Sequence, residues 1–107
     1  MTWPPVKRVG ESELRRRFNE GLYYERALAG ELRMEKLSDE PAPKKAGQRR
    51  GARSQIVAYF DGNTKVWVVH QYWHRHSGTV GGSGKKRPDP RMIYENGTIY
   101  QLDKTLP

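Results

Sequence analysis

Cysteine is absent from the sequence of 107 residues, which excludes a disulfide framework and a thiolate metal site as supports of the fold. Long apolar runs are absent too: no stretch reaches membrane-spanning length, and the N-terminus holds no signal-peptide core. We therefore expect a cytoplasmic protein with no membrane partner. Apolar residues make up only 35% of the chain, but three Trp, six Tyr and two Phe provide bulk for one domain with a modest core.

Acidic residues are scarce in the second part of the chain. Residues 1–40 carry eight basic and eight acidic side chains, whereas residues 41–53 carry five basic side chains and no acidic one. The whole net charge of +8 thus arises after residue 40. A surplus of this size attracts phosphate-bearing partners through long-range attraction and counterion release. The first part is typical of a self-paired surface. The rest indicates a surface that binds nucleic acid, unless the protein is simply basic, with no specific partner.

The N-terminal third predicts an extended arm followed by a helix. Pro4 and Pro5 disfavour helix within residues 1–10. Ser12 is a suitable N-cap, and apolar residues then recur at helical spacing: Leu14, Phe18, Leu22, Leu28, Ala29 and Leu32. We expect a helix over about residues 11–37, whole or broken at Gly21, that ends before Pro41.

The pattern changes to strands after a basic linker at residues 38–52. Residues 53–60 and 64–75 are rich in β-branched and aromatic side chains, and Asp61-Gly62-Asn63 between them is a hairpin turn signal. The second of these segments is dense enough in such residues to be the central strand of a sheet.

A second hairpin is predicted over residues 91–102. Its two-residue turn, Asn96-Gly97, places Tyr94 opposite Ile99 and Ile93 opposite Tyr100. Together these elements predict an α+β fold in which one long N-terminal helix packs on a four-stranded antiparallel sheet made of two hairpins. Residues 11–107 would form this single domain.

Two basic segments are candidates for phosphate contacts. The linker is flexible by composition. We expect its four cations, and the arginine that begins the following strand, to contact a nucleic-acid backbone: Lys44, Lys45, Arg49, Arg50 and Arg53. A Gly/Lys-rich loop at residues 77–91 adds Lys85, Lys86 and Arg87. This loop is not a nucleotide-binding loop, because Thr79 stands where that template needs glycine and two prolines prevent a following helix.

Ring-bearing side chains lie on one face of the predicted central strand. Alternation places His70, Tyr72, His74 and His76 on this face and Trp67, Trp73 and Arg75 on the other. Tyr72 and the imidazoles offer flat surfaces on which bases can stack, while Arg75 can bind phosphate. Because stacking rings outnumber groove-reading elements, we expect RNA rather than DNA as the partner.

Two alternative functions fit the same residues. Metal-independent RNase chemistry needs a general base, a general acid and a cation, for which the candidates are His70, Tyr72, His74 and Arg75. The segment 54–75, a basic sheet with Tyr, His and Arg, loosely resembles the small mRNA-interferase toxins, which implies RNase activity but no particular catalytic residue. Alternatively, a small inhibitor or assembly subunit would use its basic loops on an acidic protein surface.

A metal or cofactor is not expected. His74 and His76 have the spacing to present two imidazoles to one zinc ion from a strand. Neither a third ligand nor an acidic cluster accompanies them, so we interpret them as polar residues at the exposed end of a strand.

Overall fold

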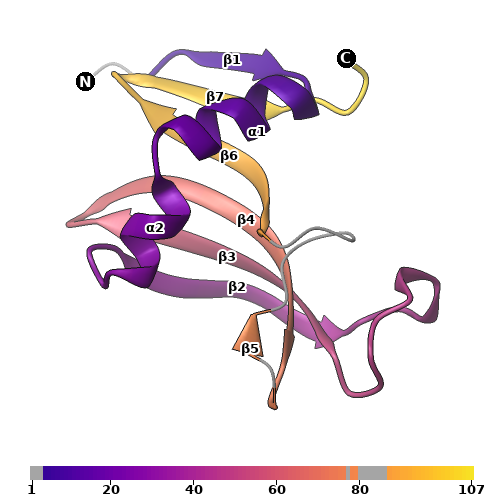
Figure 1. Ribbon diagram of the computed structural model, residues 1–107. Helices are drawn as coiled ribbons and strands as arrows, with labels where there is room; N and C mark the ends of the chain where they lie inside the picture. Colours follow the sequence, from indigo (N-terminus) through magenta and orange to yellow (C-terminus); the bar gives the residue numbers. More distant parts are fainter. Residues whose placement is uncertain (1–3, 77, 80–86) are drawn as a thin grey trace.

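The computed structural model describes residues 4–76, 78–79 and 87–107, which form a mixed sheet with two short helices (Figure 1). Six strands run in the order β1-β7-β6-β4-β3-β2, and the two-residue strand β5 (Gly78–Thr79) pairs with the end of β4. The prediction of one long helix on a four-stranded antiparallel sheet is therefore wrong. Two elements that the sequence did not reveal, β1 and β2, flank the predicted hairpins.

The helical region is divided by its backbone. Helix α1 (Glu11–Glu20) ends at Gly21, whose N–H donates to the carbonyl of Arg17. The next residue, Leu22, has φ 55°, a left-handed conformation that interrupts the helix, and the short helix α2 (Tyr23–Leu28) follows. Gly30, with φ 78°, then turns the chain into a strand.

Strand β2 (Arg33–Pro41) replaces the last part of the predicted helix and the start of the predicted linker. It pairs antiparallel with β3 (Arg53–Asp61) as an edge strand. Nearly all its side chains are exposed, so no apolar alternation marks it in the sequence. The rest of the predicted linker is a loop, residues 42–52, that contains one 3-10 turn, Lys44–Ala46.

The predicted N-terminal arm contributes to the sheet. Strand β1 (Val6–Val9) pairs parallel with β7 (Thr98–Leu102), which makes the sheet mixed. Because Pro4 and Pro5 precede β1, their missing N–H groups leave this ladder intact.

Both predicted hairpins are present. Strand β3 pairs with β4 (Thr64–His74), and β6 (Asp89–Glu95) pairs with β7. Tyr94 lies opposite Ile99 and Ile93 opposite Tyr100, as predicted. The turn residues Asn96 and Gly97 have φ 51° and 81°, as a two-residue turn of this hand requires. Strand β6 begins inside the segment predicted as a loop.

The core lies between the helices and one half of the sheet. Leu14 and Phe18 of α1 and Tyr23 of α2 pack against the fully buried Trp67 of β4. The indole of Trp67 stacks on the ring of Tyr59, with centroids 4.1 Å apart. Strands β3 and β4 extend beyond the helices toward loop 42–52, as Figure 1 shows at the lower right. This projecting half carries many of the predicted binding residues.

Candidate functional site

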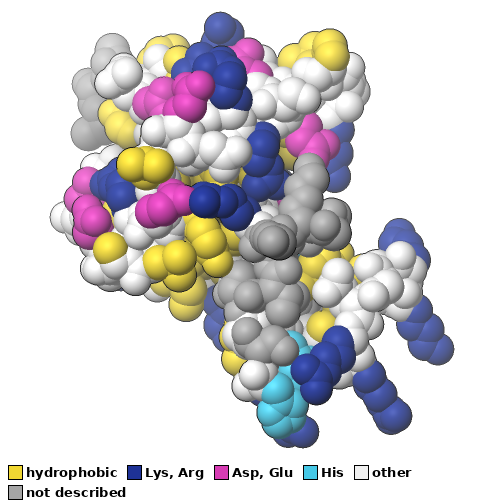
Figure 2. Space-filling model, in the orientation of Figure 1, with side chains coloured by type: hydrophobic (Ala, Val, Ile, Leu, Met, Phe, Trp, Pro, Cys, Tyr) yellow, Lys and Arg dark blue, Asp and Glu magenta, His cyan; other side chains and the backbone are white. Residues whose placement is uncertain are grey.

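Loop 42–52 and the end of β4 bring predicted cations together at one end of the sheet. In Figure 2 dark blue side chains project from the lower right of the molecule, with no magenta acidic side chain among them in this view. We call the following residues the basic end: Lys44, Lys45, Arg49, Arg50, Arg53 and Arg75. All except Arg53 are exposed.

The cations of the basic end differ in how far they are neutralised. The side chains of Lys44, Lys45, Arg50 and Arg75 form no ion pair with any residue that the structure describes. Arg53, in contrast, donates from Nε to Asp39 Oδ1 over 2.8 Å. Its guanidinium and the ammonium of Lys36 lower the pKa of Asp39 to about 2. Arg53 is thus engaged locally, whereas Lys44, Lys45, Arg50 and Arg75 have no such carboxylate partner among the described residues.

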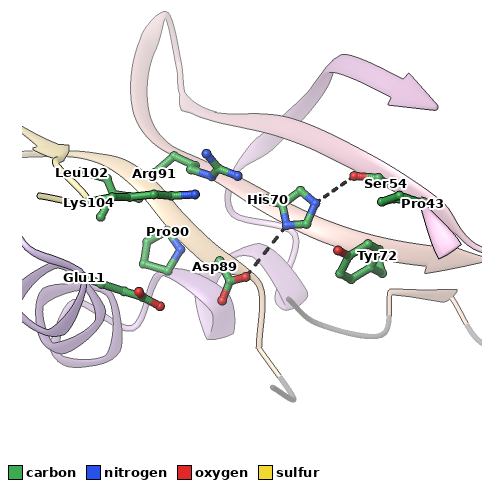
Figure 3. Close-up of a pocket in the computed structure, with 10 residues that line it drawn as sticks. All are labelled: Glu11, Pro43, Ser54, His70, Tyr72, Asp89, Pro90, Arg91, Leu102 and Lys104. Carbon is green, nitrogen blue, oxygen red and sulfur yellow. Dashed lines mark hydrogen bonds and ion pairs between the residues drawn. The ribbon is translucent and has the colours of Figure 1, made fainter. Parts of the chain in front are cut away.

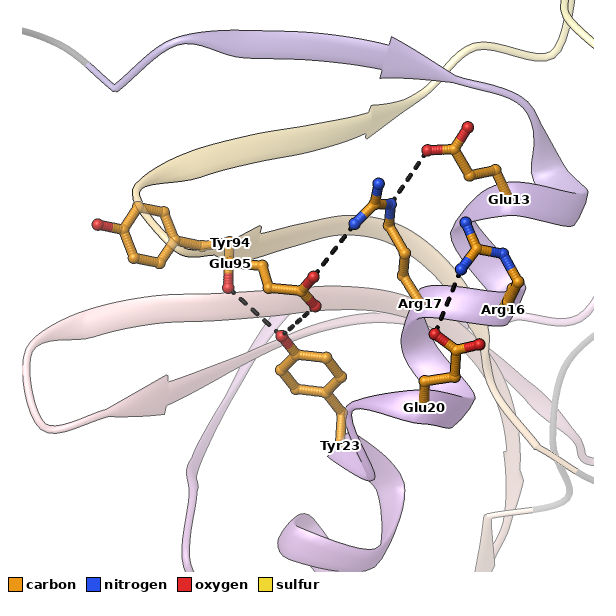
Figure 4. Close-up of polar contacts among 7 residues, drawn as sticks. All are labelled: Glu13, Arg16, Arg17, Glu20, Tyr23, Tyr94 and Glu95. Atoms are coloured by element: carbon orange, nitrogen blue, oxygen red, sulfur yellow. Dashed lines mark hydrogen bonds and ion pairs between the residues drawn. The ribbon is translucent and has the colours of Figure 1, made fainter.

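The helical half of the molecule shows the opposite arrangement (Figure 4). Arg17 bridges Glu13, 3.0 Å away on the same helix, and Glu95, 3.2 Å away on β6. Arg16 pairs with Glu20. Burial, followed by the charge of Glu95, raises the pKa of Tyr23 to about 12, so its hydroxyl remains a donor to that carboxylate. Charges in this half stabilise the packing of the helices and are not arranged for a polyanion.

His74 connects the loop to the sheet. Its Nδ1 accepts a hydrogen bond from the backbone N–H of His76, so Nε2 carries the proton and donates to the carbonyl of Arg50, 3.1 Å away. The side chain is only 5% exposed. Both ring nitrogens are therefore engaged, and the bond from Nε2 holds the loop against the end of β4. A catalytic or zinc-binding role for His74 would require one of these hydrogen bonds to break.

Of the four rings chosen from the sequence on the strand face, His76 is open to solvent, whereas His70, Tyr72 and His74 are buried. Tyr72 is only 6% exposed, and its ring meets that of His70 edge-on with centroids 4.8 Å apart. Trp73, half-buried, pairs across the ladder with Arg53 and lines a pocket of about 350 Å³. His76 is exposed. The predicted alternation, which placed Trp73 on the same face as Arg75, was the sequence signal that could have identified this ring.

The second predicted basic segment is only partly described. Lys85 and Lys86 lie outside the described residues. Arg87 forms an ion pair with Glu25 of α2, and its guanidinium lies 5.4 Å from the centre of the Tyr24 ring. Arg87 is therefore engaged with helix α2 and does not join the basic end.

A separate pocket of about 440 Å³ lies between the β3–β4 hairpin, the start of β6 and the end of β7 (Figure 3). Ser54 Oγ is 2.8 Å from His70 Nε2, and His70 Nδ1 is 3.9 Å from Asp89 Oδ2. Of the predicted catalytic candidates, His70 and Tyr72 line this pocket. Ser54 and Asp89, which complete the polar row, were not selected from the sequence.

Known proteins provide no assignment for either region. Neither a protein-family model nor a curated protein nor a solved structure matches the chain. Among the described residues, no helix has the length and apolar character needed to cross a bilayer. Nor do three or more His, Asp or Glu side chains converge on a metal-sized space in that part of the chain.

Proposed function

We propose that the protein binds single-stranded RNA through its basic end. The observation that carries this proposal is the separation of charge. Arginines of the helical half are paired with carboxylates, whereas Lys44, Lys45, Arg50 and Arg75 form no ion pair with a described residue. Unpaired like charges held close together repel one another, and a polyanion removes that repulsion while it releases its counterions.

The aromatic rings favour a single strand over a duplex. Trp73 and His76 lie at the basic end, beside Arg75, with part of each side chain exposed. Unpaired bases stack on such rings while cations track the backbone. Helix α1 is unsuited to reading a DNA groove, because its Arg16 and Arg17 are already paired with carboxylates of the protein.

The loop is held in a defined place before any ligand binds. The hydrogen bond from His74 to Arg50 and the backbone bond from Ala42 N–H to the Ala52 carbonyl close loop 42–52 at its base. A cation cluster that is already positioned loses less conformational entropy on binding than a flexible tail. This supports a dedicated binding loop at residues 42–52.

Fluorescence anisotropy with a labelled oligouridine tests the proposal. Lys44→Gln/Lys45→Gln should weaken binding about tenfold at low salt, because two phosphate contacts are lost. The matched control is Lys7→Gln/Lys65→Gln, which removes the same charge from two exposed lysines that form no ion pair with a described residue. An equal loss of affinity in both variants would mean that the effect arises from net charge alone. Failure of the wild-type protein to bind RNA, with capture of an acidic protein instead, would favour the inhibitor or assembly alternative.

A further inference from the structure

The polar row in the 440 Å³ pocket has the order of groups that activates a serine (Figure 3). Ser54 comes from β3, His70 from β4 and Asp89 is the first residue of β6. From these positions the three side chains form a line from hydroxyl to imidazole to carboxylate. We propose that Ser54 is a nucleophile, with His70 as its general base, in a site that hydrolyses small carboxylic esters with an anionic acyl group.

Asp89 determines which nitrogen of His70 carries the proton. Arg15 donates to Asp89 Oδ1 over 2.5 Å and to the carbonyl of Pro88 over 2.7 Å, which keeps the carboxylate charged and fixes its orientation. The other oxygen, Oδ2, faces His70 Nδ1 at 3.9 Å. A negative charge at this distance favours a proton on Nδ1. The lone pair of Nε2 is then directed at Ser54 and accepts its hydroxyl proton over 2.8 Å.

Burial adds to this arrangement. His70 is 8% exposed, and its ring makes a T-shaped contact with the ring of Tyr72. The imidazole therefore has little freedom to turn away from Ser54. A general base that is oriented by a carboxylate and restrained by packing is the combination that nucleophilic catalysis by serine requires.

The remainder of the pocket indicates the class of substrate. Its volume falls within the range of small-molecule sites. Arg91 and Lys104 line it, and neither side chain forms an ion pair with a described residue. Two available cations beside a nucleophile suit a substrate whose acyl part carries a carboxylate, such as a monoester of a dicarboxylic acid.

The reaction balances without a cofactor. His70 Nε2 takes the Ser54 proton as Oγ bonds to the ester carbonyl carbon, and the carbonyl electron pair moves to oxygen. When the pair returns, the bond to the alcohol oxygen breaks, and the alcohol leaves with the proton held by His70. Water then attacks the acylated Ser54, His70 takes and returns one proton in the same way, and the acid is released with Ser54 regenerated.

A fluorophosphonate probe tests the nucleophile directly, because it modifies serines that a neighbouring base has activated. We expect one adduct on the wild-type chain, located on Ser54 by peptide mass spectrometry and absent from Ser54→Ala. The substitution His70→Gln should slow labelling at least tenfold while the thermal unfolding midpoint shows that the chain is still folded. No adduct on Ser54, an adduct on another serine, or equal labelling of His70→Gln would overturn the proposal.

Two further measurements keep the test decisive if His70→Gln does not fold. The wild-type labelling rate should rise with pH, because a general base acts only in its unprotonated form, and a flat profile would contradict a histidine base. With nitrophenyl esters as substrates, the succinyl ester should be hydrolysed faster than the acetyl ester, and Arg91→Gln should reduce that preference. Preference for the acetyl ester would overturn the substrate class. Because this site shares no cation with the basic end, its failure leaves RNA binding untouched.

Discussion

The imidazole of His74 donates to the backbone carbonyl of Arg50 over 3.1 Å, and this bond joins the end of β4 to the loop that carries most of the basic end. We expect His74→Ala to lower the free energy of unfolding by about 1–2 kcal/mol, since a partly buried hydrogen bond and the packing of a buried ring are lost. Amide exchange in residues 44–52 should also increase. His76→Ala is the control, because its exposed ring leaves the Arg50 bond in place. Unchanged exchange in the loop would show that His74 does not hold it.

Leu22 offers a substitution that increases stability. Its φ of 55° costs a side-chain-bearing residue about 1–2 kcal/mol, whereas glycine adopts this conformation freely but loses more backbone entropy on folding. Since Leu22 is 55% exposed, little packing is lost. Leu22→Gly should therefore raise the free energy of unfolding by about 0.5–1 kcal/mol. Leu28→Gly, at an exposed helical position, should lower it by about 1 kcal/mol. Urea unfolding distinguishes the two, and destabilisation by Leu22→Gly would contradict the left-handed assignment.

The ion pairs of Asp39 should make the stability of the fold sensitive to acid. Hydrogen bonds from Arg53 and Lys36 lower its pKa from 3.8 to about 2. A folded-state pKa below the unfolded one contributes stability that is present above the unfolded pKa and lost as pH falls through the folded pKa. Asp39→Asn should therefore show a smaller loss of urea midpoint than the wild type between about pH 4 and pH 2. Parallel curves for the two proteins would remove Asp39 from this account. Asp61→Asn, at the exposed end of β3, is the matched control.

Trp73 should report on RNA directly. If bases stack on its ring, Trp73→Ala should weaken oligonucleotide binding by about 1–3 kcal/mol, while Trp73→Phe should retain part of the affinity. The fluorescence of Trp73 should also be quenched as RNA is added. Full affinity in Trp73→Ala would mean that the bound strand follows the cations of loop 42–52 without touching the sheet.

The hairpins could be predicted because their signals are local. Asn96-Gly97 fixes a turn whose geometry sets the pairing of the neighbouring strands, and that register is observed. Strand β2 had no comparable signal, since its side chains are nearly all exposed and show no apolar alternation. Leu22 also belonged to an apolar stripe at helical spacing, yet it lies in a left-handed bend and is 55% exposed.

The pocket could not be predicted because it depends on two β-bulges. The β3–β4 turn pairs Asp61 with Thr64, and an unbroken ladder from there would place Ser54 opposite Gln71. A bulge between Tyr59 and Phe60 shifts the register by one residue, so Ser54 lies opposite Tyr72, on the face of His70.

A second register shift, between Val68 and Val69, pairs His70 with Asp89 of β6. Sequence reasoning found His70 from its residue type. These register shifts determine which residues lie beside His70, and no residue pattern in the chain predicts them.

The salt dependence of RNA affinity tests the central claim most directly. For a single strand, the slope of log K against log salt is about −0.7 per phosphate neutralised. The fourfold variant Lys44→Gln/Lys45→Gln/Arg50→Gln/Arg75→Gln should therefore have a slope smaller in magnitude by about 3 than the wild type. Its weakening should be the same for oligonucleotides of every sequence, because phosphate contacts position the strand without reading it. A wild-type affinity that does not change with salt, or an unchanged slope in the variant, would contradict binding through the basic end.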